Sequence, residues 1–248
     1  MRDFAVSTLW RISEFERMRN SNDAHASILG GGPTLLPTTL LADLRQLRRG
    51  SAPEDVLEVM AACVRHREPA LLYLEYGPLV WPVTLFPTRH LYHSPCDVKD
   101  LHATAGLSKL KLISAERPGV RPPGDAMHDR VAAADKYRPL ASLLWAVALY
   151  GPRSALLNEI GGRAAYRLAP GRAEIHPAPS GALAPAVQRL RQEASSVRDM
   201  ARWPGLSVER ASRLLNALYL TDALMVTRSH PAARNEPVPW RTFLKLRR

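Results

Sequence analysis

Cysteine and long apolar runs are both scarce in this 248-residue chain. The two cysteines, Cys63 and Cys96, are too few for a disulfide framework, so a reduced, cytoplasmic setting is the simplest expectation. No apolar run approaches the roughly 20 residues that span a bilayer, so no membrane-spanning segment is expected. Apolar residues still make up 46% of the chain and charged residues 23%, which is the composition of a protein that folds around a core.

Positive charge is concentrated in the second half of the chain. The whole chain carries 34 basic and 23 acidic residues, a net charge of +11. Residues 1–120 contribute +1 and residues 121–248 contribute +10, of which +7 falls within 184–248. Such a surplus attracts an anionic polymer or a membrane surface. Arginine supplies 29 of the 34 basic residues, however, and codon bias in the source genome would produce the same excess.

Two stretches rich in proline and glycine, 116–124 and 176–185, predict linkers or long loops. They divide the chain into three expected parts. Residues 1–115 are expected to form an α+β sensing or interaction domain, 126–176 a unit of two helices and a hairpin, and 184–248 a separate basic domain.

In the first part, apolar residues at helical spacing predict helices over 38–50 and 51–64. The second of these is expected to begin with a capping box formed by Ser51 and Glu54. Glu54, Asp55 and Glu58 have the pattern of a solvated acidic helix start, which the helix dipole favours.

Strand patterns follow these two helices. Residues 70–76 and 79–86, separated by Gly77-Pro78, predict a β-hairpin, and Pro82 indicates an edge strand. Further strands are expected at 89–92 and 109–113. We therefore expect a sheet with helices on one face.

The second part begins with a strongly apolar helical pattern. Pro139 suits a first helical turn, and the residues from Leu140 to Ala148 form an apolar face. A short helix is expected at 153–160 and a small hairpin at 162–176.

The most specific pattern lies at 195–218, where two short helices are separated by Pro204-Gly205. Ser196 is expected to cap the first helix and Ser207 the second. Gly205 tolerates the positive φ that a tight turn between helices often needs. Two strands are expected after the second helix, at 223–228 and 240–248, and together with their loop they would form a wing.

This order of elements resembles the winged helix-turn-helix domains of bacterial transcription regulators such as the isocitrate lyase regulator and multiple-antibiotic-resistance types. The resemblance covers about 184–248 only and departs from those families at Trp203-Pro204 and at 221–223, where a glycine usually precedes the wing strand. The residues that carry it are Met200-Ala201, Gly205-Leu206-Ser207, Ser212-Arg213-Leu214-Leu215, Leu218 and the aliphatic strand after Asp222. The expected fold class is therefore α+β: a mixed sheet-and-helix domain, a helical region and a C-terminal winged helix.

The resemblance implies that the second helix lies in the major groove of DNA with its N-terminal residues at the base edges. Arg210 and Arg213 would suit guanine, and Ser207 would suit a phosphate. Glu209 would repel phosphate unless it reads a cytosine amine or pairs with an arginine. The expected DNA-binding residues are Ser207, Glu209, Arg210, Ser212, Arg213, Asn216, Arg228, Arg234, Arg241 and Lys245.

We therefore expect a cytoplasmic, bacterial-type transcription regulator whose N-terminal domain binds a partner or a ligand. The alternative is a scaffold protein in signalling or assembly whose winged helix binds protein, because a fold does not fix its function. The partner is accordingly double-stranded DNA or a protein. A homodimer is suggested only by analogy with the symmetry of operators.

Other chemistry is not expected. His90, His93 and Cys96, with Cys63 and His66 upstream, include the ligand types of zinc, but their spacing is poor. Cys96 could be a reactive thiol only with a lowered pKa, and Asp97 beside it fits a helix cap equally well. The glycine-rich run 30–34 lacks the lysine of a phosphate-binding loop. No catalytic motif is present, so we expect no enzyme, no cofactor and no metal.

Overall fold

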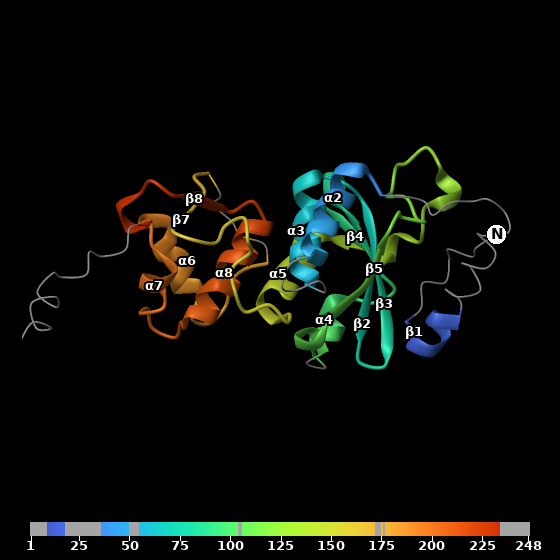
Figure 1. Ribbon diagram of the computed structural model, residues 1–248, viewed down its shortest axis with the longest axis horizontal. Helices are drawn as coiled ribbons and strands as arrows, with labels where there is room; N and C mark the ends of the chain where they lie inside the picture. The colour runs from blue at the N-terminus through green and yellow to red at the C-terminus, as the bar shows by residue number, and fades with distance from the viewer. Residues whose placement is uncertain are drawn as a thin grey trace, which may run out of the picture. The chain divides into compact units, whose positions relative to one another are not determined.

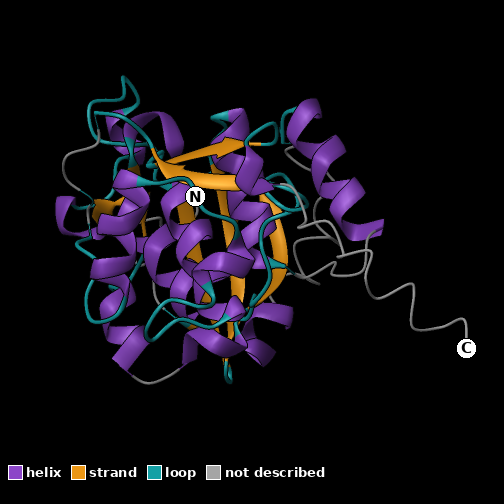
Figure 2. Ribbon diagram, turned by 90° about the vertical axis from the view of Figure 1, so that its left-hand side faces the viewer, coloured by secondary structure: helices purple, strands orange, loops and turns teal. Residues whose placement is uncertain are grey.

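The computed structural model of the protein describes residues 9–17, 36–49, 55–103, 106–171, 175 and 177–233. Its internal contacts separate the chain into two compact units, Met1–Ser154 and Ala155–Arg248. Helices and strands both contribute substantially, and the strands in each sheet pair antiparallel, so the fold class is α+β (Figure 2). No helix in the described part of the chain is long and apolar enough to cross a membrane.

The first unit is built on one antiparallel sheet. Across the described residues its strands are β1 (Trp10–Arg11), β2 (Ala70–Tyr76), β3 (Leu79–Phe86), β4 (Leu91–His93), β5 (Lys111–Glu116) and β6 (Tyr137–Pro139). Their order is β5-β2-β3-β4-β6, and β1 pairs with the start of β3. β2 and β3 form the predicted hairpin, with Tyr76 opposite Leu79 and Gly77 at φ +58° in the turn.

Pro82 was expected to mark an edge strand, but β3 has partners on both sides. β2 pairs along its whole length on one side. On the other side β1 pairs with residues 79–80 and β4 with residues 84–86. Pro82 lies between these two pairings, where no neighbouring residue needs an amide donor from it. The prediction that β3 is an edge strand is therefore wrong. Its physical reason still applies at Pro82, because proline has no backbone N–H to donate and none is needed at this position.

Helices cover one face of this sheet. Figure 1 shows α2, α3 and α5 on that face, and the helical residues 12–17 beside β1 on the other. Phe15 packs there on Tyr73 and Val80, so the second face is partly covered as well. Besides residues 12–17, the described α-helices of this unit are α2 (Thr38–Arg49), α3 (Val56–His66), α4 (Val98–Ala103) and α5 (Leu140–Tyr150).

The start of α3 differs from the expected capping box. Asp55 is its N-cap and accepts hydrogen bonds from the backbone N–H groups of Leu57 and Glu58, at 3.1 and 3.2 Å. The side chains of Asp55 and Glu58 are only 11% and 7% exposed and both pair with Arg153. The prediction of a solvated acidic start for α3 is therefore wrong, because both carboxylates pair with Arg153, which is itself largely buried. Ser51 and Glu54 lie outside the described residues.

In its described residues the second unit combines a small sheet with three α-helices. They are β7 (Ala165–Leu168), α6 (Leu183–Gln192), α7 (Val197–Met200), α8 (Val208–Leu220) and β8 (Leu224–Thr227). β7 and β8 pair antiparallel, and Tyr166 of β7 also forms an isolated antiparallel bridge with Ser195. β7 thus lies between Ser195 and β8, and α6, α7 and α8 gather beside this pair (Figure 1).

Two expectations for the middle of the chain are wrong. Residues 153–160 form turns and irregular backbone rather than a helix. β7 pairs with β8, more than fifty residues later in the chain, and Tyr166 of β7 bridges to Ser195 on the other side, whereas the expected hairpin strand at 172–176 lies outside the described residues except for Ile175. The boundary between the units consequently falls inside the expected 126–176 segment, because α5 and β6 join the first sheet and β7 joins the second.

Candidate nucleic-acid interface

The first helix of the predicted pair is short and firmly anchored. Ser196 caps α7, as expected: its Oγ accepts from the backbone N–H of Asp199 at 3.2 Å and donates to the Asp199 carboxylate at 2.6 Å. Met200, the last residue of α7, is fully buried. Arg198 and Arg202 are exposed, so this anchored turn presents two cations to solvent.

The turn between the helices depends on Gly205. Its φ is +73°, and a Cβ at this position would lie 2.7 Å from the Cβ of Ala182, at the start of α6. Trp203, where the sequence departs from the regulator families, is buried in this turn and lies under the guanidinium of Arg189, 4.7 Å from the ring centroid. Trp203 therefore adds a buried apolar side chain to the turn.

The N-terminal turn of α8 is the exposed part of that helix. Ser207 caps it by accepting from the backbone N–H of Arg210 at 3.2 Å, as predicted. Ser207, Val208, Glu209 and Arg210 are all exposed, Val208 to 60%. Beyond this turn the helix is almost entirely buried. The expected groove-facing surface is thus confined to one turn rather than running along the helix.

Ser212 and Asn216, both predicted to contact DNA, are buried. Ser212 is 4% exposed and donates to the backbone carbonyl of Val208 at 2.8 Å. Asn216 is fully buried; its amide donates to the carbonyl of Ala155 and its carbonyl accepts from the N–H of Leu157, both at 2.9 Å. The structure does not offer these two side chains to DNA, because Asn216 bonds to the irregular segment at 155–157 and Ser212 bonds within its own helix.

The predicted arginines are present but partly engaged. Arg213 forms an ion pair with Glu209 at 3.0 Å. This is one of the two arrangements in which Glu209 was expected not to repel phosphate. Arg210 donates to the carbonyl of Gly205 at 2.5 Å while remaining exposed. Arg228 follows β8 and donates to the carbonyls of Gly161 and Glu159, at 2.9 and 3.1 Å. Arg234, Arg241 and Lys245 lie outside the described residues, as does the expected strand at 240–248.

Sequence reasoning missed Arg198 and Arg202 as members of this surface. They are four residues apart and flank the end of α7, so the spacing alone would have placed both on one side of a helix. With Arg210 they are three exposed cations of the second unit, which holds 15 basic and 7 acidic residues.

The zinc and thiol candidates of the first unit have structural roles. Across the described residues no three histidine, cysteine or acidic side chains are placed to hold a metal. Cys63 is fully buried, which raises the pKa of its thiol to about 12, and burial also raises the pKa of Cys96. Neither thiol has the lowered pKa that reactivity requires.

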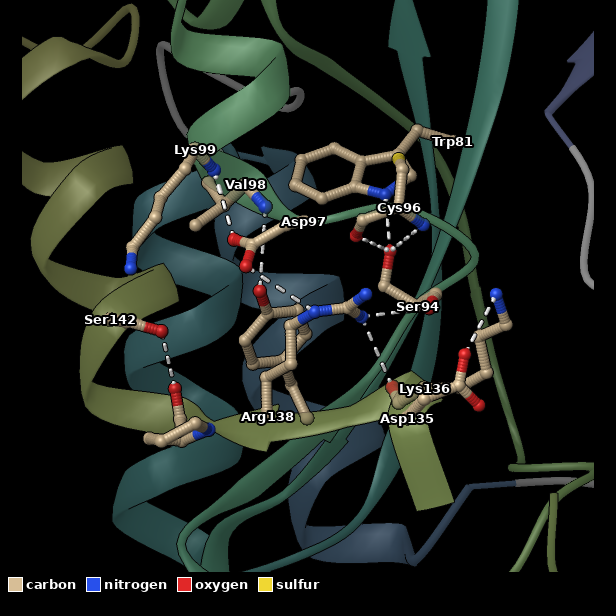
Figure 3. A network of polar contacts seen from close by, with 12 residues as sticks. Trp81, Ser94, Cys96, Asp97, Val98, Lys99, Asp135, Lys136, Arg138 and Ser142 are labelled. Carbon is tan, nitrogen blue, oxygen red and sulfur yellow. Dashed lines mark hydrogen bonds and ion pairs between the residues drawn. The ribbon is translucent and has the colours of Figure 1, made fainter. Parts of the chain in front are cut away.

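The loop around Cys96 is instead held by a polar network, which Figure 3 shows. Ser94 accepts from the indole N–H of Trp81 at 2.7 Å and donates to the carbonyl of Cys96 at 2.9 Å. Arg138 donates to the Ser94 carbonyl at 3.1 Å and lies 3.5 Å from Asp97. Asp97 accepts from the N–H of Lys99 at 3.0 Å, which confirms it as the cap of α4.

Comparisons of the chain with protein-family models, with curated proteins and with solved structures find no match. Function is therefore inferred from this chain's own residues.

Proposed function

We propose that the second unit is a winged helix-turn-helix of the bacterial-regulator type that binds double-stranded DNA. In this proposal the protein is a transcription regulator whose first unit binds a partner or a ligand. The observation that carries it is the exposed first turn of α8, with Ser207 and Arg210 in the positions from which a recognition helix reaches base edges. Arg198 and Arg202 are exposed on and just after α7, which contacts α8, and would add charge for phosphate contacts.

The order of elements supports the proposal. A capped short helix, a glycine turn and a longer helix are followed directly by a strand, as in winged helices. In the described part the strand beside β8 is β7, which comes earlier in the chain. The proposed wing would therefore be built around β7 and β8.

The test is binding of the full-length protein to a fluorescein-labelled duplex of about 20 base pairs, followed by fluorescence anisotropy at low salt, about 50 mM. Arg210→Glu should weaken binding by at least about tenfold, because an exposed cation at the groove is replaced by an anion. Arg89→Glu makes the same charge change at an exposed site of the first unit and is the matched control.

The proposal requires Arg89→Glu to bind nearly as the unaltered protein does. Equal losses in both variants would mean that only net charge matters. No binding to any duplex at low salt would overturn the proposal outright.

A protein partner is the second candidate, and Val208 is the observation that favours it. A valine that is 60% exposed in the middle of the candidate surface adds apolar area that phosphate contacts do not need. Val208→Ser would weaken a protein contact strongly but change duplex affinity little. Pull-down of the full-length protein from its native cells, with and without nuclease, separates the two: a stoichiometric protein that persists after nuclease supports the second candidate.

A further inference from the structure

A pocket in the second unit shares Arg198 and Arg202 with the proposed DNA surface but does not include the first turn of α8. It lies between the residues leading into β7, α7 and residues 231–233, and its volume is about 440 Å³. Small-molecule sites commonly have volumes of about 300 to 1,000 Å³. The lining includes neither Ser207 nor Arg210, so the pocket and the first turn of α8 can be tested separately.

Three arginines line this pocket: Arg163, Arg198 and Arg202. Arg202 lies 3.8 Å from Asp199, which is the one acidic side chain of the lining. Within the described residues, the side chains of Arg163 and Arg198 make no hydrogen bond or ion pair. The lining therefore carries a net charge of +2, with two guanidinium groups for which the described residues supply no acceptor.

The remainder of the lining is mainly apolar. It includes Ala164, Val197 and Ala233. Tyr166 also belongs to it, but the tyrosine hydroxyl already donates to the carbonyl of Ile160 at 2.7 Å. A ligand that fits both parts has an anionic group at the arginines and an apolar body against the other wall.

We propose that this pocket binds a small phosphate monoester that carries an apolar or aromatic body. A phosphate monoester has close to two negative charges at neutral pH, which matches the lining, and its oxygens accept paired N–H groups from guanidinium forks. Sequence analysis gave no sign of this site, because its arginines come from two segments more than thirty residues apart.

The proposal is tested by titrating the full-length protein with phenyl phosphate in a calorimeter. Saturable binding is expected with a Kd below about 1 mM. Arg163→Ala and Arg198→Ala should each raise that Kd by at least about tenfold, because each removes a charged hydrogen-bond donor. Arg167→Ala removes an exposed arginine on β7 that does not line the pocket, and should change the Kd by less than about twofold.

Two further titrations test which parts of the ligand are needed. Phenol lacks the charge and should not bind, and inorganic phosphate lacks the apolar body and should bind more weakly than phenyl phosphate. The absence of saturable binding up to about 10 mM phenyl phosphate would overturn the proposal, as would unchanged affinity in both arginine variants.

A labelled duplex distinguishes a free phosphate monoester from the phosphates of DNA. If saturating duplex leaves the Kd for phenyl phosphate unchanged, the pocket is a small-molecule site. If duplex displaces phenyl phosphate, the arginines belong to a DNA backbone contact and the small-molecule proposal is overturned. Phenyl phosphate binding by a protein that binds no duplex would leave this site standing while the DNA proposal fails.

Discussion

Asn216 ties α8 to the segment before β7 through both ends of its side-chain amide. Removing the amide leaves the buried N–H of Leu157 without its acceptor, which costs about 1–3 kcal/mol, and also breaks the hydrogen bond to the carbonyl of Ala155. Asn216→Ala should therefore lower the free energy of unfolding by about 2–5 kcal/mol, measured by urea denaturation. Had this residue read a base, as the sequence suggested, the substitution would weaken DNA binding and leave stability nearly unchanged.

His93 predicts a pH dependence of stability. Its side chain is almost fully buried, its Nε2 has no hydrogen-bond partner in the described structure, and its pKa is lowered from 6.5 to about 4. Burial is the main cause, and the nearby charges of Arg138 and Lys136 add to it. As the pH falls below 6.5, the unfolded chain takes up a proton that the folded protein does not. Stability is thus lost between pH 6.5 and about 4, by up to about 3 kcal/mol.

The measurement is the difference in unfolding free energy between pH 7 and about pH 4.5. His93→Phe should reduce that difference, because the ring is kept and the titrating group is removed. His128→Phe replaces an exposed histidine and is the control. An unchanged pH dependence in His93→Phe would mean that carboxylates alone cause the acid destabilisation.

The turn before α8 sets the angle between the two helices, and Gly205 is its most constrained residue. Gly205→Ala introduces both a side chain at φ +73° and a Cβ only 2.7 Å from Ala182. Gly181→Ala, at φ +55° with nothing within 4 Å, carries only the backbone part of this cost and is the matched control. We expect losses of about 1 kcal/mol for Gly181→Ala and about 2–4 kcal/mol for Gly205→Ala, measured by thermal unfolding. Equal losses would mean that the contact with Ala182 relaxes without cost.

Elements whose partners are close in sequence were predicted well. The hairpin at 70–86 and both serine caps follow from side chains and turn residues within a few positions of one another. β7 was given the wrong partner because its real one, β8, is joined to it through three helices. The buried states of Asp55 and Asn216 were missed for the same reason: each depends on residues about sixty or more positions away.

The candidate interface was recovered only in part. Ser207 and Arg210 lie on the exposed first turn of α8, and the cap that starts this turn joins residues only three positions apart. Which side of the later turns is buried depends on the neighbouring segment at 155–157, and helical periodicity alone does not contain that information.

Charge differs between the two units, and this difference predicts how the whole molecule responds to salt. Residues 155–248 carry a net +8 of the total +11. If the second unit binds a duplex through several phosphates, the logarithm of the binding constant should fall linearly with the logarithm of salt concentration, with a slope of about −3 or steeper. Arg210→Ala should make that slope shallower by about one unit if it contacts phosphate, and should leave the slope nearly unchanged while weakening binding if it contacts a base edge. Anisotropy titrations at four or more salt concentrations separate these outcomes. A slope near zero would show that duplex binding does not use the charge of this unit, which would favour Val208 and a protein partner instead.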